Sequence, residues 1–143
     1  MKKVKEEMQS DKTPKYTVKE VAQIMKISAH TIRYYDNEGL IPFVLRTQSN
    51  ARMFSEHDLS WIRTVHCLRA TNLSISDIKK YIDLCLKDNK TIPQRAKIIF
   101  DQEKILKENL KQLQEQMKVL QMKKKYYTEL LKNKSKDVWN PYK

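Results

Sequence analysis

A short stretch near the amino terminus gathers hydrogen-bond donors and an aromatic ring at the spacing of one helix face. Thr31, Arg33 and Tyr34 lie ahead of Gly39, the only glycine of the chain, and His30 precedes them. Free N–H groups at the start of a helix attract phosphate, and the helix dipole adds to this attraction. An arginine on such a helix can pair with a phosphate or read a guanine edge. The set therefore indicates a helix that enters a DNA groove.

A second group of candidate contacts follows this helix. Arg46 and Arg52 flank a turn-prone segment, and either could clamp the sugar-phosphate backbone. A single arginine is more often solvated surface charge, but two beside a recognition helix favour a DNA contact. Tyr35 points away from Tyr34, and we expect it to pack into the core. The predicted DNA-binding residues are Thr17, Ala29, His30, Thr31, Arg33, Tyr34, Arg46, Asn50 and Arg52.

The sequence predicts where the helices begin, because polar capping residues stand next to apolar ones. Thr17 with Glu20 three residues later forms a capping box, and Ser55 and Ser74 repeat the pattern with an aspartate at the third position. Ser28 is a cap without a full box. These signals predict helices near 17–26, 28–38, 55–71, 74–87 and 91–133. Segment 43–54 lacks helical periodicity and predicts a two-stranded hairpin, the wing.

Composition sets the protein class. Among 143 residues, 29 Lys and Arg outnumber 17 Asp and Glu, for a formal charge of +12. This excess favours a polyanionic partner, although solubility alone could also explain it. One Gly and four Pro favour a mainly α protein, and two Cys are too few for a disulfide framework. Neither a signal peptide nor an apolar run of about 20 residues is present, so we expect a soluble, cytoplasmic protein without a membrane partner.

The last predicted helix carries apolar residues at heptad spacing. They are Ile99, Leu106, Leu113, Leu120 and Tyr127 at one position, and Leu110, Met117 and Leu131 at the other. Glu103 and Lys124 interrupt the second set. Sustained heptads argue for a coiled coil, and a chain of this size cannot bury so long a stripe alone. We therefore expect a homodimer. The alternative is that the helix folds back on its own domain.

One resemblance is specific in motif order and spacing. Residues 31–42, with Thr-Ile-Arg-Tyr-Tyr-Asp-Asn-Glu-Gly-Leu-Ile-Pro, precede Ala51-Arg52-Met-Phe54 and Asp58-Leu59. Together they resemble the DNA-binding domain of the mercury-resistance regulator (MerR) family, over residues 16 to about 82. The resemblance implies a winged helix-turn-helix followed by a long dimerisation helix. It further implies a homodimer with an antiparallel coiled coil, which binds a pseudo-palindromic site in double-stranded promoter DNA and distorts it for RNA polymerase.

Two departures from the family pattern concern backbone geometry. Lys26 stands where a glycine commonly makes the turn between the first two helices, and a left-handed backbone costs Lys more than Gly. The wing carries Asn50-Ala51-Arg52 where Gly-Tyr-Arg is usual. The arginine is kept, but the aromatic residue beside it is not.

Cys67 is the candidate sensor residue. Arg63, His66 and Arg69 lie close to it in the predicted helix, and nearby positive charge favours a reactive thiolate. A buried structural cysteine is the competing interpretation. The context also resembles the AdhR and NmlR subgroup of the family, which responds to aldehydes and other electrophiles through a lone cysteine in this helix. Cys85, by contrast, is expected to lie in the core.

No cofactor, metal site or catalytic set is expected. The histidines have no ligand spacing, and a chain with one Gly has no phosphate-binding glycine loop. The predicted organisation is a disordered arm 1–15, a winged helix-turn-helix domain 16–88, a coiled-coil helix 91–133 and a tail 134–143 that caps the coil or is disordered. The competing function is a coiled-coil adaptor whose helix-turn-helix makes protein contacts. An enzyme is the least favoured class.

Overall fold

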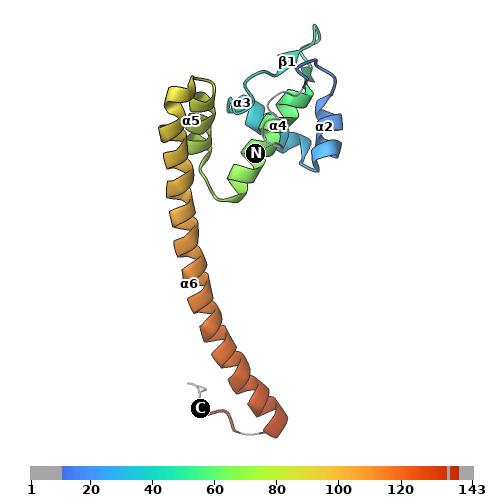
Figure 1. The fold of residues 1–143 in the computed structure, drawn as a ribbon. Helices are drawn as coiled ribbons and strands as arrows, with labels where there is room; N and C mark the ends of the chain where they lie inside the picture. Colours follow the sequence, from blue (N-terminus) through green and yellow to red (C-terminus); the bar gives the residue numbers. More distant parts are fainter. Residues whose placement is uncertain (1–10, 135, 139–143) are drawn as a thin grey trace. The chain divides into compact units, whose positions relative to one another are not determined.

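The structure is a computed structural model that describes residues 11–134 and 136–138. Almost all of its regular elements are helices (Figure 1). The chain divides into two compact units, residues 1–100 and 101–143, and the last helix runs across the division. The elements are α2 (Val18–Met25), α3 (Ala29–Asn37), β1 (Leu45–Arg46), β2 (Arg52–Met53), α4 (Glu56–Ala70), α5 (Ile75–Cys85), the 3₁₀ turn η1 (Asn89–Thr91) and α6 (Ile92–Asn133).

The helices begin where the capping residues predicted. Thr17 and Ser55 form full capping boxes with Glu20 and Asp58. At Ser74 the box is not of the predicted kind. The Ser74 hydroxyl accepts from the Asp77 backbone N–H at 3.0 Å and donates to the Asp77 carboxylate at 2.9 Å. The predicted mainly α fold with a winged helix-turn-helix and a long last helix is confirmed.

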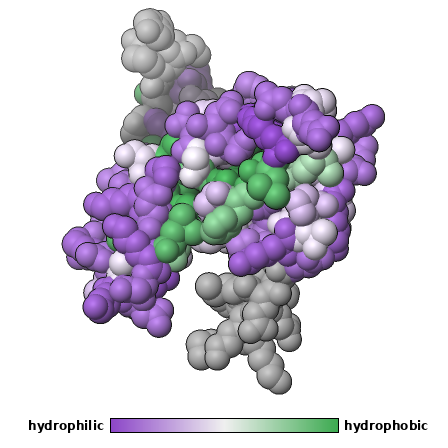
Figure 2. Space-filling view, turned by 90° about the horizontal axis from the view of Figure 1, so that it is seen from above, coloured by the Kyte–Doolittle hydropathy of each residue, from purple (hydrophilic) through white to green (hydrophobic). Residues whose placement is uncertain are grey.

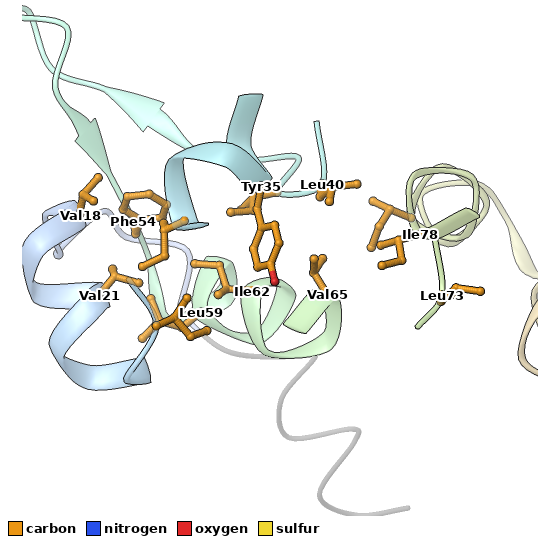
Figure 3. Close-up of a cluster of buried hydrophobic side chains, with 14 residues drawn as sticks. Val18, Val21, Tyr35, Leu40, Phe54, Leu59, Ile62, Val65, Leu73 and Ile78 are labelled. Atoms are coloured by element: carbon orange, nitrogen blue, oxygen red, sulfur yellow. The ribbon is translucent and has the colours of Figure 1, made fainter. Parts of the chain in front are cut away.

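The core of the first unit joins the amino-terminal helices to α4 and α5 (Figure 3). Its members are apolar side chains at helical spacing, together with residues that flank the helix starts. Phe54, Ile32 and Ile62 are fully buried. The cluster comprises Val18, Val21, Ile27, Ile32, Tyr35, Leu40, Ile41, Phe54, Leu59, Ile62, Val65, Leu73, Ile78 and Ile82. α2 and α3 pack on the same cluster as α4. The helix predicted to enter the DNA groove, α3, is therefore held on a rigid base.

The wing is a short antiparallel hairpin that is tied to the start of α2. Leu45 pairs with Met53 and Arg46 with Arg52. The turn between them closes through a Thr47 N–H bond to the Ala51 carbonyl at 2.8 Å, with Asn50 in the left-handed region at φ 64°. Next to β2, Phe54 forms a β-bridge with Tyr16, so the base of the wing is fixed to the domain. The predicted wing is confirmed, although each strand has only two residues.

The turn between α2 and α3 was expected to be strained or differently shaped, because Lys26 replaces the usual glycine, and Lys26 adopts the left-handed conformation there. Its φ is 55° and its ψ is 39°, and its N–H caps α2 through the Ala22 carbonyl. Glycine tolerates this region better than lysine does, because a Cβ there approaches the following carbonyl oxygen. The turn therefore keeps the geometry of a glycine turn with a lysine in place.

The predicted disordered arm covered residues 1–15. Residues 1–10 lie outside the described part of the chain, but the prediction is wrong for residues 11–15. The Asp11 carbonyl accepts from the His57 N–H at 3.1 Å, and the Lys15 N–H donates to the Phe54 carbonyl at 2.8 Å. Low apolar content misled the prediction, since these bonds use the main chain.

The second unit consists of most of α6 and a short stretch of the tail. The Tyr126 hydroxyl donates to Asp137 Oδ1 at 2.8 Å and accepts from the Val138 N–H at 3.1 Å, so this part of the tail folds back on the helix. The predicted tail beyond Val138 lies outside the described residues. Within the described residues, no helix is both long and apolar enough to cross a bilayer.

Candidate DNA-binding interface

The exposed face of α3 carries three side chains of different chemistry. His30, Arg33 and Tyr34 are all exposed, and they lie three and four residues apart, which places them on one face. Ile32 and Tyr35 are buried on the opposite face. The face therefore presents an imidazole, a guanidinium and a phenol to solvent, all of which can donate to phosphate or base edges.

The start of α3 carries an N-cap made by two neighbouring hydroxyl side chains. Ser28 caps the helix and accepts from the Thr31 N–H at 3.1 Å, while the Ser28 and Thr31 hydroxyls lie 2.8 Å apart. Ala29 and Thr31 are half-buried there. Thr17 is exposed at the start of α2, although its hydroxyl is engaged by Glu20 at 3.0 Å. Two helix N-termini therefore carry the predicted contacts of the helix-turn-helix.

Tyr35 anchors the recognition helix, as the sequence predicted. Its side chain is 3% exposed and its hydroxyl lies 3.1 Å from His66 Nδ1 on α4. Burial raises the pKa of Tyr35, which favours the protonated phenol further. Tyr34 is 42% exposed and free to reach outward.

The two wing arginines occupy different environments. Arg52 Nε lies 2.6 Å from Asp36 Oδ2, its Nη2 donates to Asn37 Oδ1 at 2.8 Å, and its side chain is 13% exposed. Arg46 is 42% exposed and lies 3.8 Å from the same Asp36 oxygen. Asn50 is exposed at the tip, where its carbonyl accepts from Arg46 Nη1 at 3.1 Å. Asp36, their common partner, was not predicted from the sequence, because a lone aspartate near a helix end is usually a solvated surface charge.

Cys67 lies on α4 and is exposed in the single chain, unlike the buried structural cysteine of the competing interpretation. Its role as a sensor stays a prediction. Cys67 opens on a pocket of about 210 Å³ between α2 and α4. The lining residues are Ile24, Met25, Ile27, Arg63, His66 and Cys67. The pocket thus has an apolar wall on one side, and the Cys67 thiol with the Arg63 and His66 side chains on the other. Cys85 is half-buried, and Arg95 Nη1 approaches its Sγ at 4.0 Å.

The predicted seam of α6 is exposed in the single chain. Seven of its eight members are large apolar residues that are each at least 42% exposed, and Ile99 is half-buried. The exposed members are Leu106, Leu110, Leu113, Met117, Leu120, Tyr127 and Leu131. Figure 2 shows a different face of the molecule, seen from above Figure 1, which is mainly hydrophilic with a hydrophobic band across its middle.

Metal-ligating side chains do not gather in the described part of the chain. No group of three or more His, Cys, Asp or Glu residues there could hold an ion. The absence of a metal site stays a prediction from the sequence.

Comparison with known proteins identifies the family to which this fold belongs. The profile of the MerR helix-turn-helix regulatory protein family matches residues 16–85. The crystal structure of HiNmlR, a MerR family regulator lacking the sensor domain and bound to promoter DNA, superposes with a TM-score of 0.71. It is 32% identical, and the match covers 84% of this chain and 95% of that one. The chain belongs to the MerR family.

Other MerR relatives agree. A putative MerR family transcriptional regulator from Listeria monocytogenes is 33% identical with a TM-score of 0.73, over 82% of this chain and 89% of that chain. The regulator AdhR of Bacillus subtilis is 35% identical over 59% of this chain and 61% of its own length. An uncharacterised regulator of Haemophilus influenzae is 37% identical over 62% of this chain and 66% of its length. The match therefore spans less than two thirds of these two curated relatives.

These relatives settle the class of protein. All are transcriptional regulators, so the prediction of a MerR-type regulator rather than an enzyme is confirmed. The resemblance to the AdhR and NmlR subgroup is confirmed as well, because AdhR and HiNmlR are both among the relatives.

Proposed function

We propose that this MerR-family chain acts as a homodimer that binds a pseudo-palindromic promoter site and distorts it so that RNA polymerase can engage. The observation that carries the proposal is the exposed α3 face of His30, Arg33 and Tyr34 beside a wing that carries Arg46. That face is backed by buried Tyr35 and Ile32, so its donors are held in fixed positions. The DNA-bound HiNmlR structure supports the same use of the fold.

Charge along α6 favours an antiparallel dimer. Residues 118–136 hold seven Lys and one Glu, whereas residues 101–117 hold three Lys and four acidic residues. A parallel pair brings the two lysine-rich ends together, and an antiparallel pair sets each against the more acidic stretch of the other chain. Like charges across a coiled-coil seam disfavour the parallel form. The apolar members of the seam that are exposed in one chain become buried in either form.

A polar pair in the seam is a further part of this proposal. Glu103 and Lys124 interrupt the apolar set and could meet across the two-fold axis to fix register. In the single chain Glu103 already accepts from Lys107 at 2.6 Å, one turn along the helix. A charge reversal at Lys124 that leaves dimer affinity unchanged would remove the pairing.

Salt dependence tests DNA binding directly. A duplex selected by the protein from a random library should bind with an affinity that falls steeply with salt, because each phosphate contact contributes about −0.9 to the slope of log K against log salt. For two recognition helices and two wings, we expect the slope of log K against log salt to be about −4 or steeper. An adaptor that uses its helix-turn-helix for protein contacts should select no sequence from the library and show no such slope.

We propose in addition that Cys67 is a sensor, which reacts with electrophiles and so alters this DNA-binding unit. The thiol is exposed beside a pocket, and His66 in the same pocket bonds Tyr35 of the recognition helix. Addition to an aldehyde carbonyl forms one C–S bond and moves the thiol proton to the carbonyl oxygen, so no further reactant is needed. An adduct in the pocket would press on α2 and on the His66–Tyr35 contact.

Cys67→Ser should abolish the response to a small aldehyde while leaving DNA affinity within about twofold, because the side chain lies outside the α3 face. The measurement is transcription from the selected site in vitro, with and without the aldehyde. Cys85→Ser is the matched control and should respond as the wild type does. An unchanged response in Cys67→Ser would contradict this role.

A further inference from the structure

Two arginines face each other directly across the wing, which is an unfavourable arrangement by itself. The hairpin register pairs Arg46 with Arg52. Like charges opposite each other on neighbouring strands destabilise the pair. A carboxylate of another element offsets them, because both guanidinium groups approach the same Oδ2 atom of Asp36.

The two arginines share this carboxylate unequally. Arg52 holds it at 2.6 Å, adds the bond to Asn37 and is mostly shielded from solvent. Arg46 reaches it only at 3.8 Å and keeps 42% of its side chain exposed. Charge-assisted bonds with two donors are strong and directional, whereas a single exposed pair at longer range contributes little. Arg52 therefore fixes the hairpin to α3, and Arg46 can exchange its weak partner for another anion.

We infer that Asp36 is the positioning residue of the wing and that the two arginines have separate tasks. Asp36 and Arg52 stay paired and set the place of the hairpin beside the recognition helix. Arg46 leaves Asp36 for a backbone phosphate when DNA is bound. The inference rests on the proposed DNA binding for its second half only, since the Asp36–Arg52 anchor exists in the free protein.

Asp36→Asn tests the anchor without DNA, with Glu38→Gln as the matched control. Both variants remove one negative charge near the end of α3, but Glu38 is exposed and lies two residues beyond Asp36. We expect trypsin to cut after Arg46 and Arg52 several-fold faster in native Asp36→Asn than in Glu38→Gln, because the wing opens locally. Arg52→Lys keeps one donor toward Asp36 and should fall between them. Equal cleavage rates in all three would overturn the anchor.

The second arm measures the division of tasks on the duplex selected by the wild type. Arg46→Ala should make the salt slope shallower by about 0.9, the contribution of one phosphate. In the Asp36→Asn background the same substitution should leave the slope unchanged, because the hairpin no longer holds Arg46 at its phosphate. An equal loss in both backgrounds would show that Asp36 does not position Arg46.

The two arms separate failure of the inference from failure of the proposed function. A wild-type protein that selects no duplex would refute DNA binding, and with it the phosphate contact of Arg46. The trypsin comparison would still decide whether Asp36 anchors the wing. Helical content, recorded for each variant, should match the wild type, since Asp36 lies outside the buried core cluster. The urea midpoint of Asp36→Asn should fall below that of Glu38→Gln, because only the first substitution removes a shielded ion pair.

Discussion

Leu113→Glu should abolish the dimer and lower affinity for the selected duplex by at least about 100-fold. Leu113 is 61% exposed in the single chain and lies near the middle of the predicted seam. A carboxylate buried against a second helix costs several kcal/mol, roughly, when it has no partner. Loss of the second head then removes the avidity of paired binding, which is worth roughly 10²–10⁴. Sedimentation velocity gives the dimer and fluorescence anisotropy gives the affinity.

Gln112→Glu is the matched control for this substitution. It adds the same charge one residue earlier on the helix, outside the predicted seam. We expect a dimer and an affinity close to the wild type. If both variants dimerise equally well, the exposed apolar stripe of α6 is not the dimer interface.

Phe54→Ala should destabilise the first unit by about 3–5 kcal/mol, the cost of truncating a buried aromatic side chain. Phe54 is fully buried and precedes the Ser55 cap of α4, while its main chain bridges to Tyr16. The loss therefore affects the contact between α2, the wing and α4 together. Urea unfolding followed by circular dichroism measures it.

Phe43→Ala is the matched control, because it removes the same kind of side chain at a position that is 49% exposed. Its ring contacts His57 at a centroid distance of 5.5 Å, and its removal should cost less than about 1 kcal/mol. A Phe54 variant that is no less stable than the Phe43 variant would mean that the core does not centre on Phe54.

The sequence predicted the helices well because their ends carry local signals. Thr17, Ser28, Ser55 and Ser74 each hold a backbone N–H three residues later, and such bonds need nothing from the rest of the chain. The inward turn of Tyr35 was also predictable, because its neighbour Tyr34 could not share the same face.

Partners that lie far apart in the sequence were less accessible. Arg52 was predicted as a DNA contact, which stays a prediction, but its bonds to Asp36 and Asn37 across the wing were not predicted. The binding of residues 11–15 uses main-chain groups, which leave no trace in side-chain chemistry. The link from His66 to Tyr35 joins two helices through side chains that are 31 residues apart. Such contacts follow from packing rather than from local pattern.

We expect two copies of this chain, joined through α6, to place two recognition helices on one duplex. Native mass spectrometry of the protein with the selected duplex tests it most directly. Two chains should bind each duplex at every ratio up to saturation. Inserting about five base pairs between half-sites should remove this complex, because it turns one half-site to the opposite side of the DNA. A saturated complex with one chain per duplex, or equal binding to the lengthened site, would contradict it.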